Sequence, residues 1–219
     1  MSHNRERFRN LKDSIYFGTL VAGFSVFLTA GILLIPLLGL QADEVLFVYH
    51  LWFPERGADW IPFLDHNLPT MMMTYLGALK SWLYTPILSI FGPTVWSIRL
   101  PALALATLTI ALAGHLLRKI AGPQAGPIGV WLLATDVTFL LTAVFDWGPV
   151  VLQNFLLISA ILLVERWSKN RRSILLFLAG LVFGLALWDK ALFFWNLSGM
   201  GIALLVVNAR AFVREVYSK

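Results

Sequence analysis

The stretch that decides the fold is residues 14–42, SIYFGTLVAGFSVFLTAGILLIPLLGLQA, which contains no charged side chain. A bilayer core about 30 Å thick needs roughly 20 apolar residues in one helix. The apolar stretch of a secretory signal is shorter, about 7–15 residues, and is followed by a small-residue cleavage site. This run is longer and follows a basic start with Arg5, Arg7, Arg9 and Lys12. It predicts an uncleaved membrane-spanning helix at about residues 15–40.

The composition extends this conclusion to the whole chain. Of the 219 residues, 58% are hydrophobic and 13% are charged, against roughly 45–50% and 25% in globular proteins. The mean hydropathy is +0.76. Cysteine is absent, which excludes a disulfide scaffold, Cys-ligated zinc and thiol catalysis. The composition therefore predicts a polytopic membrane protein.

Five further apolar runs predict five more spans. They lie at about residues 97–117, 124–145, 147–165, 173–190 and 191–209. The span at 124–145 contains one acid, Asp136, and the span at 173–190 is short enough to need local thinning of the bilayer. The predicted fold class is an all-α polytopic membrane protein, with about six transmembrane helices in one domain over residues 1–219. The segment 41–96 is an outer loop containing interfacial helices.

The positive-inside rule decides the orientation. Residues 70–92 are apolar enough to be a seventh span but carry Lys80 near their middle. With six spans, most of the 17 Lys and Arg residues face the cytoplasm, as do both termini. A seventh span would move the basic loops at 118–119 and 166–172 outside. We therefore expect residues 70–92 to be interfacial or re-entrant. The high pI of about 9.7 reflects topology, and a nucleic-acid partner is not expected.

Two adjacent acids, Asp43 and Glu44, follow the first span at the outer membrane surface. One interpretation is a general base with an orienting neighbour. The other is that the carboxylates only cap or solvate a helix end. A third acid, Asp146, lies in Phe145-Asp146-Trp147-Gly148-Pro149, which links the third and fourth spans on the same outer face. Helix capping explains Asp146 equally well.

Other polar residues allow weaker hypotheses. Asp136 lies inside a span, where an acid is costly and often functional, but Thr135 and Thr138 could satisfy it locally. His50 and His66 share the outer loop with several acids, so a divalent cation stays open as a ligand, without a tight ligand spacing. Most Trp residues fall near the outer face, which indicates an aromatic belt or a groove for a lipid or sugar.

Several motifs together resemble a known family. They are Ala42-Asp43-Glu44, the stretch 68–80 (LPTMMMTYLGALK), Phe91-Gly92 with 97–101 (SIRLP), 145–149 (FDWGP) and 184–190 (GLALWDK). In this order they resemble C-type glycosyltransferases, above all glycosyltransferase family 39, which includes the protein O-mannosyltransferases, and the related lipid A aminoarabinose transferases.

The resemblance implies an inverting transferase that takes a sugar from a polyprenyl-phosphate carrier on the non-cytoplasmic face. Asp43 would then be the catalytic base, with Glu44 beside it, and Asp146 would be the second acid of the site. The leaving lipid phosphate needs cations in a low-dielectric site, and Lys80, Arg99 and Lys190 are the expected donors. His66 and Trp147 complete the predicted substrate-binding set. No cofactor is implied, and the acceptor is a lipid, glycan or protein.

Three functions stay open at this point. The first is the glycosyltransferase or its N-terminal half, because members of the family usually run to about twice this length with further spans. The second is a non-catalytic membrane module that binds lipid-linked sugar or scaffolds a partner. The third is a small transporter, which only Asp136 favours. A multi-pass protein without cysteine suits a bacterial inner membrane.

Overall fold

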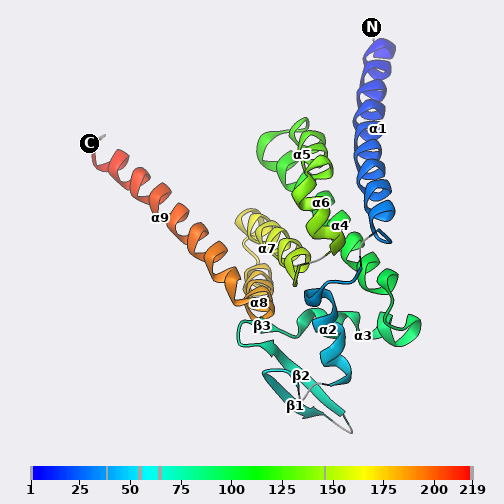
Figure 1. Ribbon diagram of the computed structural model, residues 1–219. Coiled ribbons are helices and arrows are strands. Elements are labelled where there is room, and N and C mark those ends of the chain that lie inside the picture. Colours follow the sequence, from blue (N-terminus) through cyan, green and yellow to red (C-terminus); the bar gives the residue numbers. More distant parts are fainter. Residues whose placement is uncertain (1, 38, 54–55, 64–65, 146, 218–219) are drawn as a thin grey trace.

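The computed structural model describes residues 2–37, 39–53, 56–63, 66–145 and 147–217, which are mostly helical (Figure 1). The helices are α1 (Ser2–Leu34), α2 (Ala42–Trp52), α3 (Leu79–Phe91), α4 (Val95–Ala121), α5 (Ala125–Thr135), α6 (Val137–Phe145), α7 (Val150–Asn170), α8 (Ser173–Asp189) and α9 (Phe194–Tyr217), with a 3-10 turn η2 (Ala191–Phe193) before α9. The strands are β1 (Asp59–Phe63), β2 (His66–Met73) and β3 (Leu76–Gly77).

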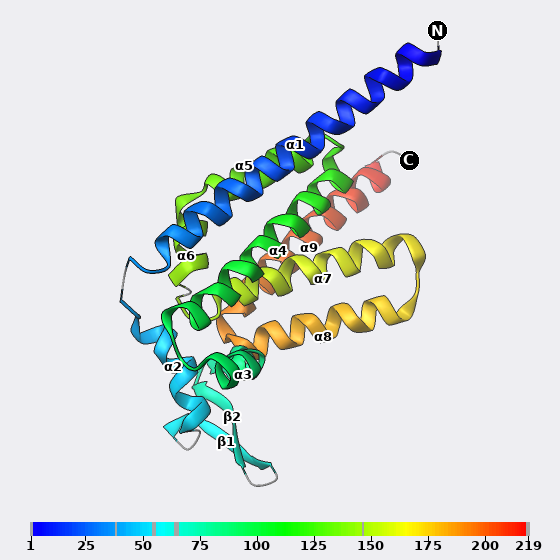
Figure 2. The ribbon, with the colours of Figure 1, turned by 90° about the vertical axis from the view of Figure 1, so that its right-hand side faces the viewer.

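The long helices run back and forth between two ends of the molecule. One end carries the sheet with α2 and α3, and the other carries both chain ends (Figures 1 and 2). That both termini lie on the cytoplasmic side of a membrane stays a prediction. The C-terminal ends of α4 and α7, which carry basic residues, also lie at the end of the molecule where the two chain termini are found.

The described residues contain four helices long and apolar enough to span a membrane, or five if a bent pair counts as one span. The four are Tyr16–Leu34, Val95–Ala121, Val150–Asn170 and Ala191–Ala209, and the bent pair is α5 with α6. The remaining predicted span corresponds to α8, whose 17 residues are about 25 Å long. The structure thus supports the multi-span prediction in part, and six full spans are not shown.

The bend between α5 and α6 has a local cause at Asp136. The two helix axes differ by 63°, and Asp136 between them has extended backbone angles. Its Oδ1 accepts a hydrogen bond from the backbone N–H of Phe139, so the carboxylate caps the first turn of α6. Thr135 and Thr142 instead donate to helix carbonyls of Trp131 and Thr138. Asp136 therefore has a structural role that needs no relay.

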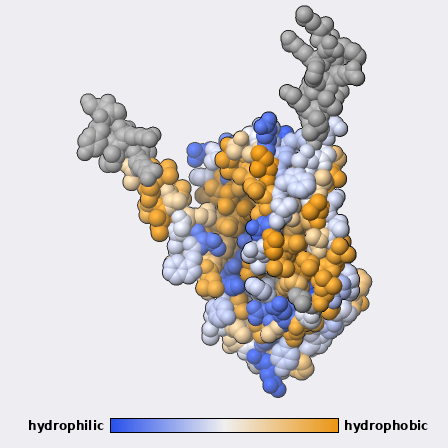
Figure 3. Space-filling model, turned by 45° about the horizontal axis from the view of Figure 1, so that its top comes forward, coloured by the Kyte–Doolittle hydropathy of each residue, from blue (hydrophilic) through white to orange (hydrophobic). Residues whose placement is uncertain are grey.

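Large apolar side chains cover the outside of the bundle, as expected for helices in lipid. Examples are Phe17 (67% exposed), Leu132 (67%) and Phe177 (66%). Figure 3 shows broad hydrophobic surfaces over the helices, with hydrophilic groups gathered in fewer places. Only 6% of the span Ala191–Ala209 is buried, and α9 extends away from the other helices (Figure 1).

A large cluster of buried apolar residues lies where α1, α4, α5 and α6 meet. Phe27 of α1, Leu103 and Ile110 of α4 and Val130 of α5 are buried in one cluster. Gly114 and Gly126 bring α4 and α5 close together, because a Cβ built on Gly126 would lie 3.1 Å from the Gly114 carbonyl oxygen. Small residues at such contacts let the helix backbones approach closely, and this close packing stabilises helix association in lipid.

The outer segment, residues 41–96, contains the two short helices α2 and α3 and a three-stranded antiparallel sheet of order β1-β2-β3. The helices agree with the prediction, whereas the sheet was not predicted. Trp60 pairs with Pro69 and Ile61 with Leu68 in the first hairpin. Residues 70–92, considered as a seventh span, are divided between β2, β3 and the 13-residue α3.

The outer segment is bonded to the junction of α8 and α9. Leu76 forms an antiparallel bridge with Lys190, and the N–H of Ala191 donates to the Tyr75 carbonyl at 2.9 Å. Trp188 Nε1 donates to the Thr70 carbonyl at 3.2 Å. A Cβ on Gly77 would lie 2.3 Å from the Trp188 carbonyl oxygen, so only glycine fits there. These contacts hold the outer segment against the ends of the spans.

Candidate active site

The two adjacent acids open α2 and have different surroundings. Helix α2 begins at Ala42, so both carboxylates lie in its first turn, where the helix dipole favours negative charge. Glu44 is fully buried, and its Oε2 accepts a hydrogen bond from the Gln41 N–H at 2.8 Å. Asp43 is exposed, and within the described part of the chain its carboxylate has no hydrogen bond or ion pair.

Arg99, at the start of α4, holds Glu44 in a bidentate ion pair. Its Nε lies 2.7 Å from Glu44 Oε1 and its Nη2 lies 2.8 Å from Oε2, with both side chains fully buried. The same guanidinium donates to the carbonyls of Ile35 at 2.6 Å and Gly39 at 2.8 Å, and stacks 4.7 Å from the Phe145 ring. Arg99 thus joins the end of α1, the start of α2 and the start of α4.

Lys80, the second predicted cation, lies in the first turn of α3 and is 1% exposed. Its Nζ sits over the rings of Phe47, at 4.4 Å from the centroid, and Tyr84, at 5.5 Å. Its backbone N–H donates to Oδ1 of Asp189 at 3.3 Å. Asp189 ends α8 and is itself fully buried. The lysine therefore lies inside the joint between α2, α3 and α8.

Lys190, the third cation, is half-buried and lies beside the turn that contains the predicted second acid. Its Nζ would be 3.5 Å from a Cβ built on Gly148, and its carbonyl accepts from Gln153 Nε2 at 3.2 Å. Trp147 in this turn is 51% exposed. Asp146 lies outside the described residues.

The histidines give little support for a metal site. His50 is buried, and its Nδ1 lies 2.8 Å from the Leu46 carbonyl within α2. His66 begins β2, and its side chain lies outside the described set. Among the described residues there is no group of three or more His, Cys, Asp or Glu side chains that could hold a metal ion.

An apolar groove of about 290 Å³ runs along α2 from the site. Val45, Val48, Tyr49 and Trp52 line it from α2, and Ile98 lines it from α4. The four α2 residues recur at helical spacing on one face of α2, whereas Asp43 lies two residues before Val45 and so points to a different face. Trp52 and Tyr49 are 50% and 39% exposed at its edge.

Residues 77–217 match a protein family described as dolichyl-phosphate-mannose-protein mannosyltransferase. The match covers well over half of the 219 residues.

The chain belongs to the dolichyl-phosphate-mannose-protein mannosyltransferase family.

This confirms the resemblance drawn from the sequence motifs. It identifies a membrane mannosyltransferase domain, and the family implies a dolichyl- or polyprenyl-phosphate-mannose donor. No match is found among curated proteins or among solved structures. The matched residues include Lys80, Arg99 and Lys190, whereas Asp43 and Glu44 precede them.

One buried polar residue of this mannosyltransferase domain was not predicted as part of the site. Asp189 lies in the motif at 184–190, which was used only for the family resemblance, and its side chain accepts a hydrogen bond from the α3 backbone. Its position next to Lys190 in the sequence was the available signal. The structure brings together Glu44 and Arg99 beside Asp43, and Lys80 and Asp189 beside Lys190. Helices α2 and α3 and the end of α8, which carry most of these residues, lie at the same end of the bundle (Figure 1).

Proposed function

We propose that this domain transfers a mannosyl group from a polyprenyl-phosphate donor to an acceptor hydroxyl, at the face that carries the outer segment. Asp43 acts as the general base. The observation that carries this proposal is the contrast between two neighbouring acids. Glu44 is buried and bound to Arg99, while Asp43 is exposed at the helix start. Only Asp43 can reach an incoming substrate.

The reaction is a single displacement. The acceptor O–H gives its proton to the Asp43 carboxylate as its oxygen forms a bond to the anomeric carbon. The bond between that carbon and the donor phosphate oxygen breaks, and polyprenyl phosphate leaves with the electron pair. Attack from the face opposite the leaving group inverts the anomeric configuration. Family membership supports the donor, and the position of Asp43 supports the base.

The cations have different roles in this proposal. Lys190 binds the leaving phosphate, because its ammonium is half-buried beside Gly148 and charge there is stabilised more strongly than in water. Arg99 and Lys80 are positioning residues, since both are buried among protein groups. Arg99 fixes the backbone between the end of α1 and the start of α2, where Asp43 lies. Lys80 is buried between α2, α3 and the end of α8, which Lys190 follows. Asp146 and Trp147, two neighbours of Gly148, contact the sugar or the acceptor.

The apolar groove along α2 accommodates the first isoprene units of the donor. Its lining is apolar, and Leu40 lines it just before the start of α2 at Ala42. An isoprene tail held in this groove contributes binding free energy that helps to orient the donor.

The first prediction tests the base. Asp43→Asn should lower the transfer rate by at least 100-fold, since general base catalysis contributes about 10²–10⁴. The thermal unfolding midpoint should not change, because the side chain is exposed. Transfer of radiolabelled mannose from polyprenyl-phosphate mannose to acceptors in membranes containing the full chain measures the rate.

Asp59→Asn is the matched control, because Asp59 is another exposed acid of the outer segment and is bonded only to Thr70 among the described residues. It should keep the parental rate. Full activity in Asp43→Asn would remove Asp43 from the mechanism. A parental chain that binds the donor and never releases its sugar would support the alternative, a non-catalytic module for lipid-linked sugar.

A further inference from the structure

Besides the apolar groove along α2, a pocket lined by both polar and apolar side chains lies at the opposite end of the bundle from the proposed active site. It has a volume of about 370 Å³ and lies between α4 and α7. His115 and Lys119 line it from α4, and Arg166 lines it from α7. His115 follows Arg99 by 16 residues on the same helix, or about 24 Å. The pocket therefore lies nearly one bilayer thickness away from the site at Arg99, and the reaction proposed above does not use it.

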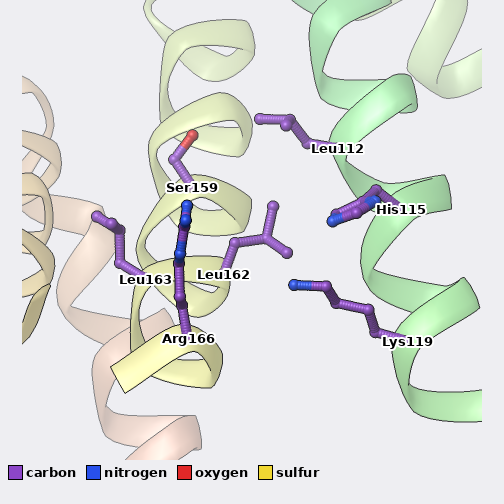
Figure 4. Close-up of a pocket in the computed structure, with 7 residues that line it drawn as sticks. All are labelled: Leu112, His115, Lys119, Ser159, Leu162, Leu163 and Arg166. Atoms are coloured by element: carbon purple, nitrogen blue, oxygen red, sulfur yellow. The ribbon is translucent and has the colours of Figure 1, made fainter. Parts of the chain in front are cut away.

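The side chains of this pocket converge. In Figure 4, His115 and the ammonium of Lys119 point from α4 toward α7, while Leu162 points back toward α4. The two helices are joined at the pocket edge by an ion pair of 2.9 Å between Lys119 Nζ and Glu165 Oε2. The pocket is thus bounded by two spans that contact each other.

The pocket keeps a net positive charge when the ion pairs of its lysine are taken into account. Glu165 is the one acid at its edge among the described residues, and it pairs with both Lys119 and Lys169. Arg166 is exposed and has no hydrogen bond or ion pair to any residue of the described part of the chain. His115 adds an N–H donor in either tautomer. A guanidinium, an ammonium and an imidazole around one cavity suit the oxygens of a phosphate group.

The apolar part of the lining indicates where that phosphate comes from. Leu112, Leu162 and Leu163 form the wall, and both α4 and α7 are candidate membrane spans. A cavity between two candidate spans that combines a leucine wall with cationic side chains suits a lipid, which has both an acyl chain and an anionic headgroup. Basic pockets between spans bind anionic headgroups in this way.

We propose that the pocket formed by His115, Lys119 and Arg166 binds the headgroup phosphate of an anionic membrane phospholipid, with an acyl chain against the leucine wall. Phosphatidylglycerol is the probe. The full chain, purified in detergent, is incubated with phosphatidylglycerol or phosphatidylcholine, and bound lipid is counted by native mass spectrometry. Phosphatidylglycerol should remain bound at lower concentration than phosphatidylcholine.

Arg166→Gln should weaken phosphatidylglycerol binding about fivefold, the size expected for one basic residue at a membrane surface. Arg172→Gln is the matched control, since Arg172 is an exposed arginine at the same end of the bundle but outside the pocket. It should leave binding unchanged. An equal loss in both variants, or no loss in either, would overturn the proposal.

The Ser159→Leu variant tests whether lipid binding needs the cavity itself or only the positive charge around it. Ser159 faces the cavity from α7 (Figure 4), and a leucine there fills space while every charge remains. This variant should also lose phosphatidylglycerol. Retained binding would mean that the cavity is not used. Displacement of the lipid by millimolar inorganic phosphate would assign the site to a soluble anion and would equally contradict a lipid site.

Discussion

At the scale of single residues, the buried pair of Glu44 and Arg99 determines how the proposed base is presented. Burying two charges costs free energy that is recovered only with good geometry and further hydrogen bonds. Both conditions hold here, because the pair is bidentate and the guanidinium also binds two carbonyls. Asp43 therefore occupies a defined place one residue before an anchored side chain.

Glu44→Gln should destabilise the fold by about 3–5 kcal/mol, because it leaves the Arg99 charge buried without a counter-charge. Thermal unfolding of the detergent-solubilised chain measures the loss. Glu165→Gln provides the comparison, since its partners Lys119 and Lys169 are 32% and 62% exposed and such pairs contribute about 1 kcal/mol or less. Equal effects of the two substitutions would contradict the role given to Arg99.

At the scale of elements, the outer segment depends on its joint with the α8–α9 junction. The Gly77→Ala variant tests this joint, because its Cβ would lie 2.3 Å from the Trp188 carbonyl oxygen. A backbone atom cannot move aside as a side-chain tip can, so we expect a loss of about 1–3 kcal/mol. Trypsin should also cut faster at the exposed Arg56 in the outer segment.

Gly180→Ala is the control for this substitution. Gly180 lies within α8, and a Cβ there meets no atom within 4 Å. Because alanine favours helix over glycine by about 0.8–1.0 kcal/mol, the variant should be as stable as the parent or slightly more stable. If Gly77→Ala behaved like Gly180→Ala, the outer segment would not be held by this contact.

The break between α5 and α6 is a second feature at the scale of elements. Asp136→Ala removes the acceptor for the Phe139 N–H and should cost about 0.5–2 kcal/mol, as for other helix caps. Asp136→Asn keeps an acceptor oxygen and should recover most of the loss in the same unfolding measurement. A large loss of transfer activity in Asp136→Asn without a loss of stability would instead revive a functional role for this acid.

At the scale of the whole molecule, the hydropathy of the sequence was sufficient to predict four of the six expected spans as single long apolar helices. Uncharged runs mark α1, α4, α7 and the segment of α9 because lipid imposes a minimum apolar length. The same argument identified α8 as short. The 63° bend was not predicted, since hydropathy averages over Asp136 and carries no information on backbone direction.

The outer segment and the site were less predictable. Strands β1 and β2 include Pro62 and Pro69, residues that disfavour a regular ladder, so the sequence indicated only interfacial structure there. Arg99 and Lys80 were expected to bind the leaving phosphate, because the family resemblance implies cations at the site. Their buried neighbours, Glu44 and Asp189, come from distant parts of the chain, so these contacts could not be predicted from the sequence.

The distance along the chain between Glu44 and Arg99 has a consequence for biosynthesis. The two residues are 55 positions apart, and ribosomes add about 5–20 residues per second. Glu44 therefore emerges several seconds before the only guanidinium with which it pairs among the described residues. During that interval its carboxylate must stay in contact with water or lipid headgroups. The first helix can enter the membrane early, but the turn between α1 and α2 becomes fixed only when α4, which carries Arg99, has been made.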